Sequence, residues 1–294
     1  MPELPDVVLY LERLDALLRG EPLERIELRH PFVLRSVEPP LAAVVGRRVL
    51  STRRLGKRLV LGLEDDLFLV LHLMIAGRLR WRSAGKKLAG RMVLATFGFP
   101  RGTLYLTEAG STRRATLHLV RSEAALAPFE RGGLEVLEAP LEPFAARLRS
   151  ESHTLKRALT DPRLFSGIGN AYSDEILHRA RLSPLALTSR LAEAEVARLY
   201  AATRAVLLEW TERLRRDVGE GFPEEVTAFR PEMAVHGRYG LPCPVCGAPV
   251  QRIRYASNET DYCARCQTGG RVLADRSLSR LLRDDWPKSI DEID

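Results

Sequence analysis

Long apolar runs are absent from this chain of 294 residues. Because no stretch of about 18 apolar residues occurs, the sequence predicts no membrane-spanning helix. The first residues are acidic and interrupted by proline, whereas a secretory signal has a basic region followed by an apolar one. We therefore expect a soluble, cytoplasmic protein with no membrane partner.

Cysteine is scarce, and its placement argues against a disulfide framework. The only four cysteines form two CxxC pairs, Cys243/Cys246 and Cys263/Cys266, separated by sixteen residues. This spacing suits one closed tetrahedral site of four thiolates, the usual form of structural zinc, better than four unconnected buried or redox thiols. We predict one Zn²⁺ with a scaffolding role. The residues between the pairs, 250–255 and 259–262, favour the two arms of a β-hairpin.

Acidic residues are outnumbered along most of the chain. The net charge is +7, but the last eleven residues hold five acidic residues and one lysine, a balance of −4, so residues 1–283 carry +11. Such a balance suits a surface that neutralises phosphates, although a charge run is more often a solvated face. Composition alone leaves both interpretations open. The basic clusters are Arg53-Arg54 with Lys57-Arg58, then Arg78, Arg80 and Arg82, and finally Arg113-Arg114.

The hydrophobic pattern changes from a helix to strands and back to helices. Apolar residues recur at helical spacing over 5–19, and Gly20-Glu21-Pro22 ends that helix. Short β-rich runs separated by turns then extend to about Val136 and favour an antiparallel sandwich or barrel. The clearest runs are 58–63, 67–73, 92–99 and 103–107, and helical periodicity returns at 155–159, 171–179 and 191–215.

With 45% hydrophobic residues the chain can bury a substantial core, and its 294 residues exceed the usual size of one domain. We expect an α+β multidomain protein in which residues 1–136 form an N-terminal helix plus an antiparallel β-sandwich. Residues 137–234 should form a linker and a helical domain, and residues 235–270 the four-cysteine zinc β-hairpin. Residues 271–294 are a C-terminal extension with an expected helix at 277–283, to which the sequence assigns no role.

Several short motifs follow one another in a recognisable order. They are Met-Pro-Glu-Leu-Pro at 1–5, Gly56-Lys57, Leu71-His72-Leu73 with Gly77-Arg78-Leu79, Gly167-Ile168-Gly169-Asn170, Asp174-Glu175-Ile176-Leu177, and Cys266-Gln267. Together they resemble the formamidopyrimidine-DNA glycosylase/endonuclease VIII family over residues 1–267, and Leu4 is similar to the formamidopyrimidine branch. The resemblance implies a helix-two-turn-helix DNA-binding domain in 137–234. It also implies a bacterial-type, nucleoid-associated monomer that acts on damaged double-stranded DNA.

Pro2 is the candidate nucleophile. Met1 precedes a small residue and is expected to be removed, which exposes a prolyl secondary amine whose pKa of about 8 lies well below the value of about 10.4 for lysine. An iminium formed by a secondary amine cannot lose an N–H proton, so it persists as an electron sink and promotes β- and δ-elimination. Glu3 is the candidate general acid for the sugar oxygen O4′. On their own, Pro2 and Glu3 favour an ordinary helix start.

Three more residues match family positions that serve the reaction or bind DNA. Lys57 resembles the lysine that contacts DNA near the lesion, and a solvated cation is the alternative. His72 could donate to a phosphate, although a lone histidine in an apolar strand is often a satisfied core residue. Asn170 follows a glycine turn that would bring backbone amides to a phosphate, and a simple interhelical turn with an asparagine cap is compatible with that role.

The sequence departs from the family pattern in the hairpin and at the start of the chain. Asn258 replaces the family arginine five residues before the third cysteine, so a bidentate phosphate clamp is lost. We list Asn258 as a DNA-binding candidate by position only. Arg252, Arg254 or Arg271 could substitute for the clamp, and Asp6 stands where the family usually has glutamate.

A second departure concerns the side chains that fill the space left by an everted base. The family uses a methionine, an arginine and a phenylalanine, whereas this chain has Leu73-Met74-Ile75 and Arg113-Arg114-Ala115. Only Arg113 matches clearly, and Met74 is the candidate for a displaced wedge. A weaker wedge favours lesions that are already unpaired or unstacked.

The sequence therefore supports a bifunctional DNA glycosylase/AP lyase for oxidised bases, with purines such as 8-oxoguanine or formamidopyrimidines favoured. Two enzymatic alternatives stay open, an endonuclease VIII-like enzyme and a lyase specific for abasic sites or single strands. An alternative of another class is a non-catalytic protein that binds damaged DNA. The altered positions Asn258 and Ala115 favour that alternative. The residues that oppose it are Pro2, Glu3, Lys57 and Asn170.

Overall fold

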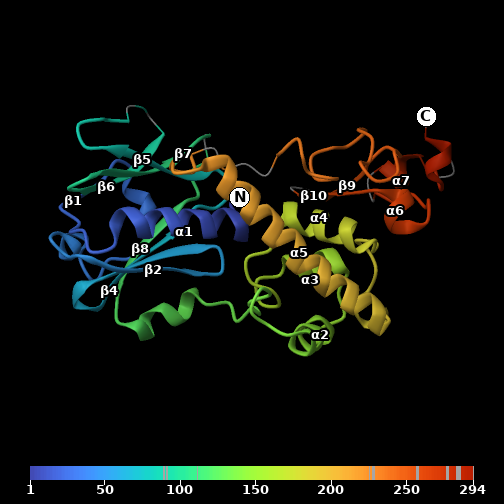
Figure 1. Cartoon of the computed structure of the whole chain (residues 1–294), viewed down its shortest axis with the longest axis horizontal. Coiled ribbons are helices and arrows are strands. Elements are labelled where there is room, and N and C mark those ends of the chain that lie inside the picture. The colour runs from blue at the N-terminus through green and yellow to red at the C-terminus, as the bar shows by residue number, and fades with distance from the viewer. Residues whose placement is uncertain are drawn as a thin grey trace. The chain divides into compact units, whose positions relative to one another are not determined.

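The computed structural model describes residues 1–88, 90, 92–110, 112–224, 226, 229–255, 258–275, 278–282 and 286–293. They fall into two compact units, Met1–Arg131 with Trp210–Thr227, and Gly132–Glu209 with Ala228–Asp294. The long helix α5 (Glu193–Val218) runs from the second unit into the first (Figure 1). The division into four segments that the sequence predicts stays a prediction, because the two units describe compactness in space and do not mark the boundaries of those segments.

The first unit contains two four-stranded antiparallel sheets, so the expected antiparallel β-sandwich is confirmed. Figure 1 shows the two groups of strands on either side of helix α1 (Leu4–Leu18) in that view. One sheet has the order β1 (Arg25–Leu28), β6 (Val93–Phe99), β7 (Gly102–Glu108) and β5 (Gly77–Ser83). The other has the order β2 (Val49–Leu55), β3 (Arg58–Leu63), β4 (Leu67–His72) and β8 (Thr116–Arg121).

Both sheets and α1 share one hydrophobic core. The helix contributes Val7, Tyr10, Leu14 and Leu18, which are at most 1% exposed. Their spacing of three and four residues puts them on one face of the helix. Full burial of each such side chain stabilises the fold by about 1.5–3 kcal/mol, so this stripe fixes α1 and the chain start that precedes it.

The outer faces of the two sheets differ. Short 3₁₀ turns connect the strands, and the segment Glu123–Phe129 packs on the sheet that contains β4. Val60, Phe68, Val70 and Leu126 form a small second core there. The outer face of the β1-β6-β7-β5 sheet has no comparable apolar cluster among the described residues. The remaining 3₁₀ turns of this unit are η1 (Pro31–Val33), η2 (Leu41–Val44) and η3 (Glu64–Asp66).

The second unit is helical and ends in the cysteine module, as the periodicity predicts. Its first helices are α2 (Leu141–Arg149), α3 (Leu155–Thr160) and α4 (Asn170–Ala180), followed by the 3₁₀ turn η5 (Thr188–Arg190) and α5. The predicted hairpin is confirmed as β9 (Gln251–Tyr255) and β10 (Asn258–Tyr262), followed by α6 (Ala264–Thr268). None of the helices in these described ranges combines the length and apolarity needed to span a bilayer.

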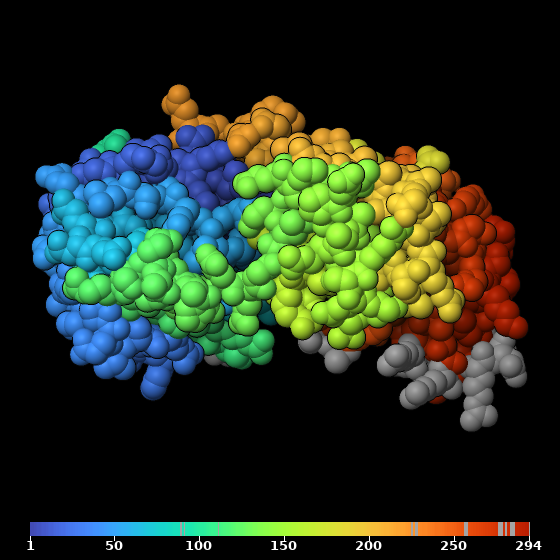
Figure 2. Space-filling model, turned by 90° about the horizontal axis from the view of Figure 1, so that it is seen from below, coloured from blue at the N-terminus to red at the C-terminus, as the bar shows by residue number. Residues whose placement is uncertain are grey.

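The C-terminal extension belongs to the core of the cysteine module. Ile290 N–H donates to Gly270 O at 2.7 Å, and Leu273 N–H donates to the Tyr262 hydroxyl at 2.7 Å. Ile290 and Leu273 are buried in the same cluster as the cysteines. In Figure 2 the red C-terminal residues form one packed lobe. The extension contains α7 (Leu278–Leu282) and η7 (Ile290–Glu292), and both ends of the helix expected at 277–283 lie outside the described residues.

Replacement of Ile290 by alanine should therefore destabilise the module by about 2–5 kcal/mol, since a buried side chain is lost. Urea unfolding with simultaneous zinc release to a coloured chelator measures this change. Leu281→Ala is the matched control, because Leu281 is 77% exposed and its loss should change stability by less than about 0.5 kcal/mol. Equal effects of the two changes would show that the extension does not stabilise the module.

Candidate functional site

The chain start is held by a reciprocal capping arrangement at the head of α1. Glu3 is the N-cap residue, and its side chain accepts the backbone N–H of Asp6. In return, Asp6 Oδ2 accepts the backbone N–H of Glu3 at 2.9 Å. Both side chains are buried, with residue exposures of 3% and 4%. Pro2 is buried as well, so this end of the helix is shielded from water.

The terminal amine lies in a charged but desolvated setting. The pKa of the Met1 amine is lowered, with burial as the largest cause. The cations of Arg78 and Lys57 act in the same direction, whereas the carboxylates of Glu3 and Asp6 oppose it. These interactions bring Lys57 and Glu3, both predicted from the sequence, into the surroundings of the chain start. They also add Arg78, which the sequence analysis treated only as part of a basic cluster.

Lys57 and His72 lie at neighbouring strand ends. Lys57 lies in the tight β2–β3 turn, where Gly56 has the left-handed φ of +60°. His72 ends β4 and is paired with Arg58 of β3 and Thr116 of β8. Burial, assisted by Arg58 and Lys57, lowers the pKa of His72 to about 4. His72 is therefore a neutral imidazole at pH 7, which can donate a hydrogen bond but adds no positive charge.

The turn after β4 exposes Ile75 more than Met74. Gly77 N–H donates to Leu73 O at 2.9 Å, and a Cβ at Gly77 would lie 2.2 Å from that oxygen, so only glycine fits. Met74 is half-buried with a left-handed φ of 52°, whereas Ile75 is 59% exposed. The exposed apolar side chain of this turn is therefore one residue beyond the one singled out from the sequence.

A buried carboxylate fixes the loop that carries Arg113. Glu108, at 2% exposure, accepts the backbone N–H groups of Arg114 at 2.8 Å and Ala115 at 2.9 Å. Arg113 is exposed on this loop, whereas Ala115 is 3% exposed and belongs to the core. Glu108 is not apparent from the sequence, because nothing in a sequence shows that a carboxylate at a strand end accepts N–H groups six and seven residues later.

In the second unit, Asn170 is the first residue of α4 and follows a glycine turn. Gly167 has a left-handed φ of +82°, and Gly169 is the N-cap residue. The ammonium group of Lys156 donates to Asn170 O at 2.7 Å and to Asp174 Oδ1 at 2.6 Å. Lys156 thus ties α3 to the first turn of α4, where the predicted phosphate-binding amides lie.

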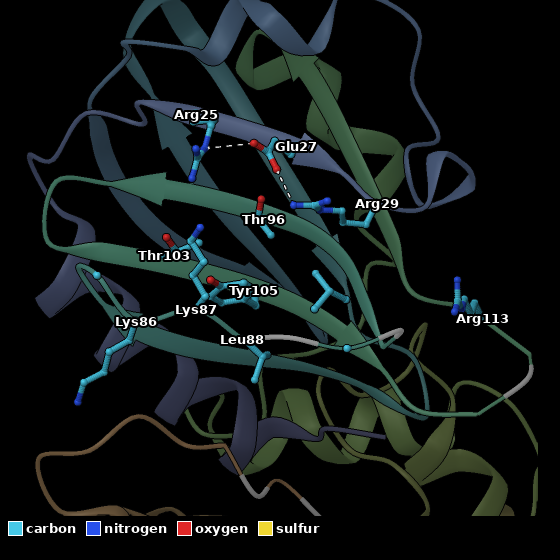
Figure 3. A pocket seen from close by; sticks show the side chains of 13 residues that line it. Arg25, Glu27, Arg29, Lys86, Lys87, Leu88, Thr96, Thr103, Tyr105 and Arg113 are labelled. Carbon is cyan, nitrogen blue, oxygen red and sulfur yellow. Dashed lines mark hydrogen bonds and ion pairs between the residues drawn. The ribbon is translucent and has the colours of Figure 1, made fainter.

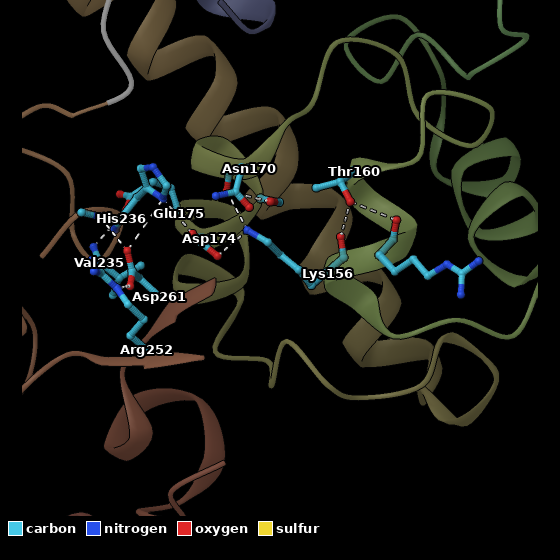
Figure 4. A network of polar contacts seen from close by, with 12 residues as sticks. Lys156, Thr160, Asn170, Asp174, Glu175, Val235, His236, Arg252 and Asp261 are labelled. Carbon is cyan, nitrogen blue, oxygen red and sulfur yellow. Dashed lines mark hydrogen bonds and ion pairs between the residues drawn. The ribbon is translucent and has the colours of Figure 1, made fainter. Parts of the chain in front are cut away.

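A buried polar network continues from Asp174 to the hairpin (Figure 4). Asp174 Oδ2 is 2.8 Å from His236 Nδ1, which is 3.9 Å from Asp261 Oδ2. Asp261 accepts the N–H of Gly237 at 2.7 Å and Arg252 Nε–H at 2.8 Å. Despite the cost of its burial, the pKa of His236 is raised, because Asp174 and Asp261 favour the protonated ring.

Glu175 adds a second connection between α4 and the segment before the cysteines. Its buried carboxylate accepts the backbone N–H groups of Ala234, Val235 and His236 at 2.8–3.0 Å. Burial nevertheless raises the pKa of Glu175. In the sequence, the Asp174-Glu175 pair is part of a family motif, but the sequence indicates no structural role for it.

The hairpin side chains divide into compensated and exposed ones. Arg252 pairs with Asp261 at 2.8 Å and with Glu259 at 3.1 Å, so its charge is compensated within the hairpin. Arg254 and Arg271 are exposed, and so is Asn258 at the start of β10. Of the three arginines considered as substitutes for the lost clamp, Arg252 is therefore the least available.

The four cysteines converge on one point. The Sγ atoms of Cys243 and Cys266 are 3.9 Å apart, and those of Cys246 and Cys263 are 3.4 Å apart. All four lie within 4.8 Å of one another. A tetrahedron with Zn–S bonds of about 2.3 Å has S···S edges of about 3.8 Å, so the donors fit one structural zinc ion. His178 Nε2 is 3.3 Å from Cys243 Sγ and supports that thiolate from outside.

Three family models match successive parts of the chain. The formamidopyrimidine-DNA glycosylase N-terminal domain matches residues 1–118, its H2TH domain matches 134–216, and the zinc finger found in FPG and IleRS matches 240–269. This chain belongs to the formamidopyrimidine-DNA glycosylase family. Members of the family are DNA glycosylases of base repair, and the zinc-finger match agrees with the cysteine geometry.

Named relatives support the same assignment. A formamidopyrimidine-DNA glycosylase of Thermus thermophilus is 38% identical over 283 residues, covering 92% of this chain and all of the relative. A formamidopyrimidine-DNA glycosylase-like protein of Mycobacterium tuberculosis is 42% identical over 151 residues, covering 51% of this chain and 94% of its own length.

Solved structures have the same fold. The crystal structure of MutM (Fpg) from Thermus thermophilus has a TM-score of 0.76 at 34% identity and covers 90% of this chain and 98% of its own. A Lactococcus lactis Fpg mutant in complex with a Fapy-dG-containing DNA has a TM-score of 0.78 at 25% identity and covers 91% and 100%.

The buried network predicts a large cost for Asp174→Asn. The change removes a charge from between Lys156 and His236 and leaves the half-buried ammonium group uncompensated, so we expect a loss of about 3–5 kcal/mol in the free energy of unfolding. Asp291→Asn is the control, since Asp291 pairs with Arg265 at 3.0 Å with side-chain exposures of 75% and 54%. That exposed pair should contribute less than about 1 kcal/mol. Urea titration measures both, and similar losses would refute the structural role of the network.

His72 predicts a specific acid sensitivity. In the unfolded chain His72 takes up a proton below about pH 6.5, whereas in the folded chain its pKa is about 4. Between these values the unfolded state binds more protons, so the free energy of unfolding should fall as the pH is lowered through this window. Urea unfolding at several pH values should show a smaller fall for His72→Gln than for the unchanged protein. Equal falls would mean that His72 is not desolvated.

Proposed function

We propose that this protein is a bifunctional DNA glycosylase/AP lyase whose nucleophile is the amine of Pro2. The observation that carries the proposal is the buried prolyl residue directly before Glu3, in surroundings that lower the pKa of a terminal amine. In the chain as described, Met1 holds the Pro2 nitrogen in a peptide bond. The reaction therefore requires that Met1 be removed.

The reaction proceeds by exchange of the base for the protein amine. Pro2 N attacks the sugar C1′, the C1′–N bond to the damaged base breaks, and the base leaves with its bonding electrons and takes up a proton. Glu3 takes up the proton that the attacking Pro2 nitrogen loses and delivers it to O4′ as the sugar ring opens, which leaves an iminium ion between Pro2 and C1′. Loss of a C2′ proton then expels the 3′ phosphate, a second elimination expels the 5′ phosphate, and water releases the sugar fragment from Pro2.

Burial supports both chemical roles. Desolvation raises the fraction of neutral amine at pH 7, because it disfavours the ammonium form. At the Met1 amine Arg78 and Lys57 act in the same direction, opposed by the carboxylates beside them, and their positive charges also suit a backbone phosphate beside the lesion. Glu3 is shielded from water at 3% exposure, which suits a carboxyl that delivers a proton to a substrate oxygen.

The DNA contacts are proposed from the remaining residues. Lys57 and Arg113 supply charge, His72 supplies a neutral N–H donor, and Asn170 lies at a helix N-terminus suited to a phosphate. Met74, and the more exposed Ile75 beside it, would fill space next to an everted base. Asn258 would contact the backbone from the hairpin as a neutral group.

The partner proposed is damaged double-stranded DNA that carries oxidised bases, with purines favoured. The relatives are named formamidopyrimidine-DNA glycosylases, and solved Lactococcus lactis complexes contain Fapy-dG DNA or an abasic site. One observation favours the narrower alternative of abasic-site preference. Ala115 is a small buried residue where the family has a large wedge, so eversion of a paired base receives less compensation.

Borohydride trapping tests the proposal. Protein freed of Met1, as verified by intact mass, should become covalently linked to abasic and 8-oxoguanine duplexes. The same protein with an uncleaved N-terminal tag keeps every side chain but has no reactive amine, so it should give no linked product. Pro2→Gly should lose most of the linked product, and Glu3→Gln should slow base release by about 10²–10⁴-fold without preventing DNA binding.

Absence of trapping by the processed protein on every duplex would overturn the enzymatic assignment. Binding to those duplexes would then leave the non-catalytic alternative. Trapping on abasic DNA alone, without release of an oxidised base, would select the abasic-site lyase.

A further inference from the structure

A large pocket lies on the outer face of the β1-β6-β7-β5 sheet, within the first unit. Strands β5 and β6 both flank β7, so the connection between them must cross β7. Residues Gly85 to Leu88 and Gly90 of that connection line the pocket, opposite β1, β6 and β7 (Figure 3). Its volume is about 790 Å³, large enough for several linked sugar-phosphate groups.

The pocket carries an excess of positive charge. Five of its lining residues are basic and only Glu27 is acidic, which gives 5 − 1 = +4. Glu27 is shared by two of the cations, with Arg25 Nε at 3.4 Å and Arg29 Nη2 at 3.2 Å. Among the residues that the structure describes, the ammonium groups of Lys86 and Lys87 form no ion pair. The fifth cation is Arg113.

The floor of the pocket is formed by hydroxyl groups. Thr96 of β6 lies opposite Tyr105 of β7, and Thr103 follows on the same face of β7. Thr96 and Tyr105 are only 7% and 6% exposed although they point away from the main core. The other sheet covers its outer face with apolar side chains. Here the chain has instead built a second covered layer of hydroxyls and cations.

This lining suits a phosphodiester backbone better than free bases. Cations and hydroxyl donors recognise phosphate oxygens, and several separated cations suit an anion whose charges are also spread out. Base recognition would require an exposed aromatic surface for stacking, and the Tyr105 ring is almost fully covered. Acidic peptides also carry spaced charges, but the continuity through Arg113 with the proposed DNA contacts favours nucleic acid.

We propose that this outer-sheet pocket binds phosphates of the same DNA at positions away from the lesion. The inference rests on the proposed function in taking DNA as the partner and Arg113 as one of its contacts near the lesion. Arg113 joins the pocket to the lesion site, while Arg25, Arg29, Lys86 and Lys87 extend the bound length of backbone. The pocket contributes affinity through charge and takes no part in the chemical steps.

The test compares two triple variants of equal charge. Arg25→Ser/Lys86→Ser/Lys87→Ser empties the pocket of three cations, and Arg48→Ser/Arg101→Ser/Arg121→Ser removes three exposed cations elsewhere in the same unit. The dissociation constant is measured over a range of salt concentrations on a long duplex and on a short duplex, both with a central abasic-site analogue. Each lost phosphate contact should reduce the slope of log Kd against log salt by about 0.9.

For the long duplex, the slope of log Kd against log salt should be smaller by about 2–3 in the pocket variant, and binding at low salt should be at least about tenfold weaker. Binding of the short duplex should be nearly unchanged. Borohydride trapping on the short duplex should stay unchanged in both variants, which separates this proposal from the proposed function. Equal slopes of log Kd against log salt for the pocket and control variants would overturn the proposal that the pocket binds DNA. The proposal would also be overturned if a fluorescently labelled duplex bound at the pocket were displaced by oligo-aspartate but not by unlabelled, undamaged duplex.

Discussion

A buried carboxylate must have its charge compensated, and this constraint organises the head of α1, the loop that carries Arg113 and the polar network around α4. Leaving one uncompensated would cost several kcal/mol, so each accepts hydrogen bonds from the groups around it. Glu108 holds the two backbone N–H groups beside Arg113, and Glu175 holds three in the segment 234–236. Because the acceptors lie on rigid elements, the loops that they hold are fixed in place.

The same constraint sorts the charges by sign. Acidic groups such as Asp174 and Asp261 are buried and satisfied inside the fold, whereas arginines and lysines remain at the surface. Residues 1–283 carry +11, and the burial of acids makes the exposed surface more positive than that sum suggests. Long-range attraction of a polyanion depends on the exposed charge, so burial of carboxylates serves stability and DNA attraction together.

Sequence periodicity could predict the elements whose burial pattern is simple. The helix Leu4–Leu18 has apolar residues at helical spacing, and the strand Arg58–Leu63 is a short continuous apolar run; both are confirmed. Strand β5 was missed because Arg78, Arg80 and Arg82 formed an apparent basic cluster. In the structure these arginines alternate with Leu79 and Trp81, so the cluster is the outer face of a strand.

The candidate residues show a similar division. The cysteines could be found because their spacing is local, whereas Pro2 and Glu3 were singled out only through the family resemblance. The contacts between Lys156, Asp174, His236 and Asp261 join positions up to 62 residues apart, and no local pattern signals them. Exposure of Ile75 rather than Met74 depends on a left-handed φ of 52° at methionine, which the residue type does not favour.

The head of α1 shows how a helix start and the terminal amine beside it can be buried together. A helix leaves its first N–H groups without partners, and burying them near a desolvated amine would be costly. Here Glu3 N–H is taken by Asp6, Asp6 N–H is taken by the Glu3 side chain, and Pro5 has no N–H. The capping pair thus removes the need for water at the helix start. The same buried environment lowers the pKa of the Met1 amine, so the local sequence that starts the helix also favours the neutral form of the amine beside it.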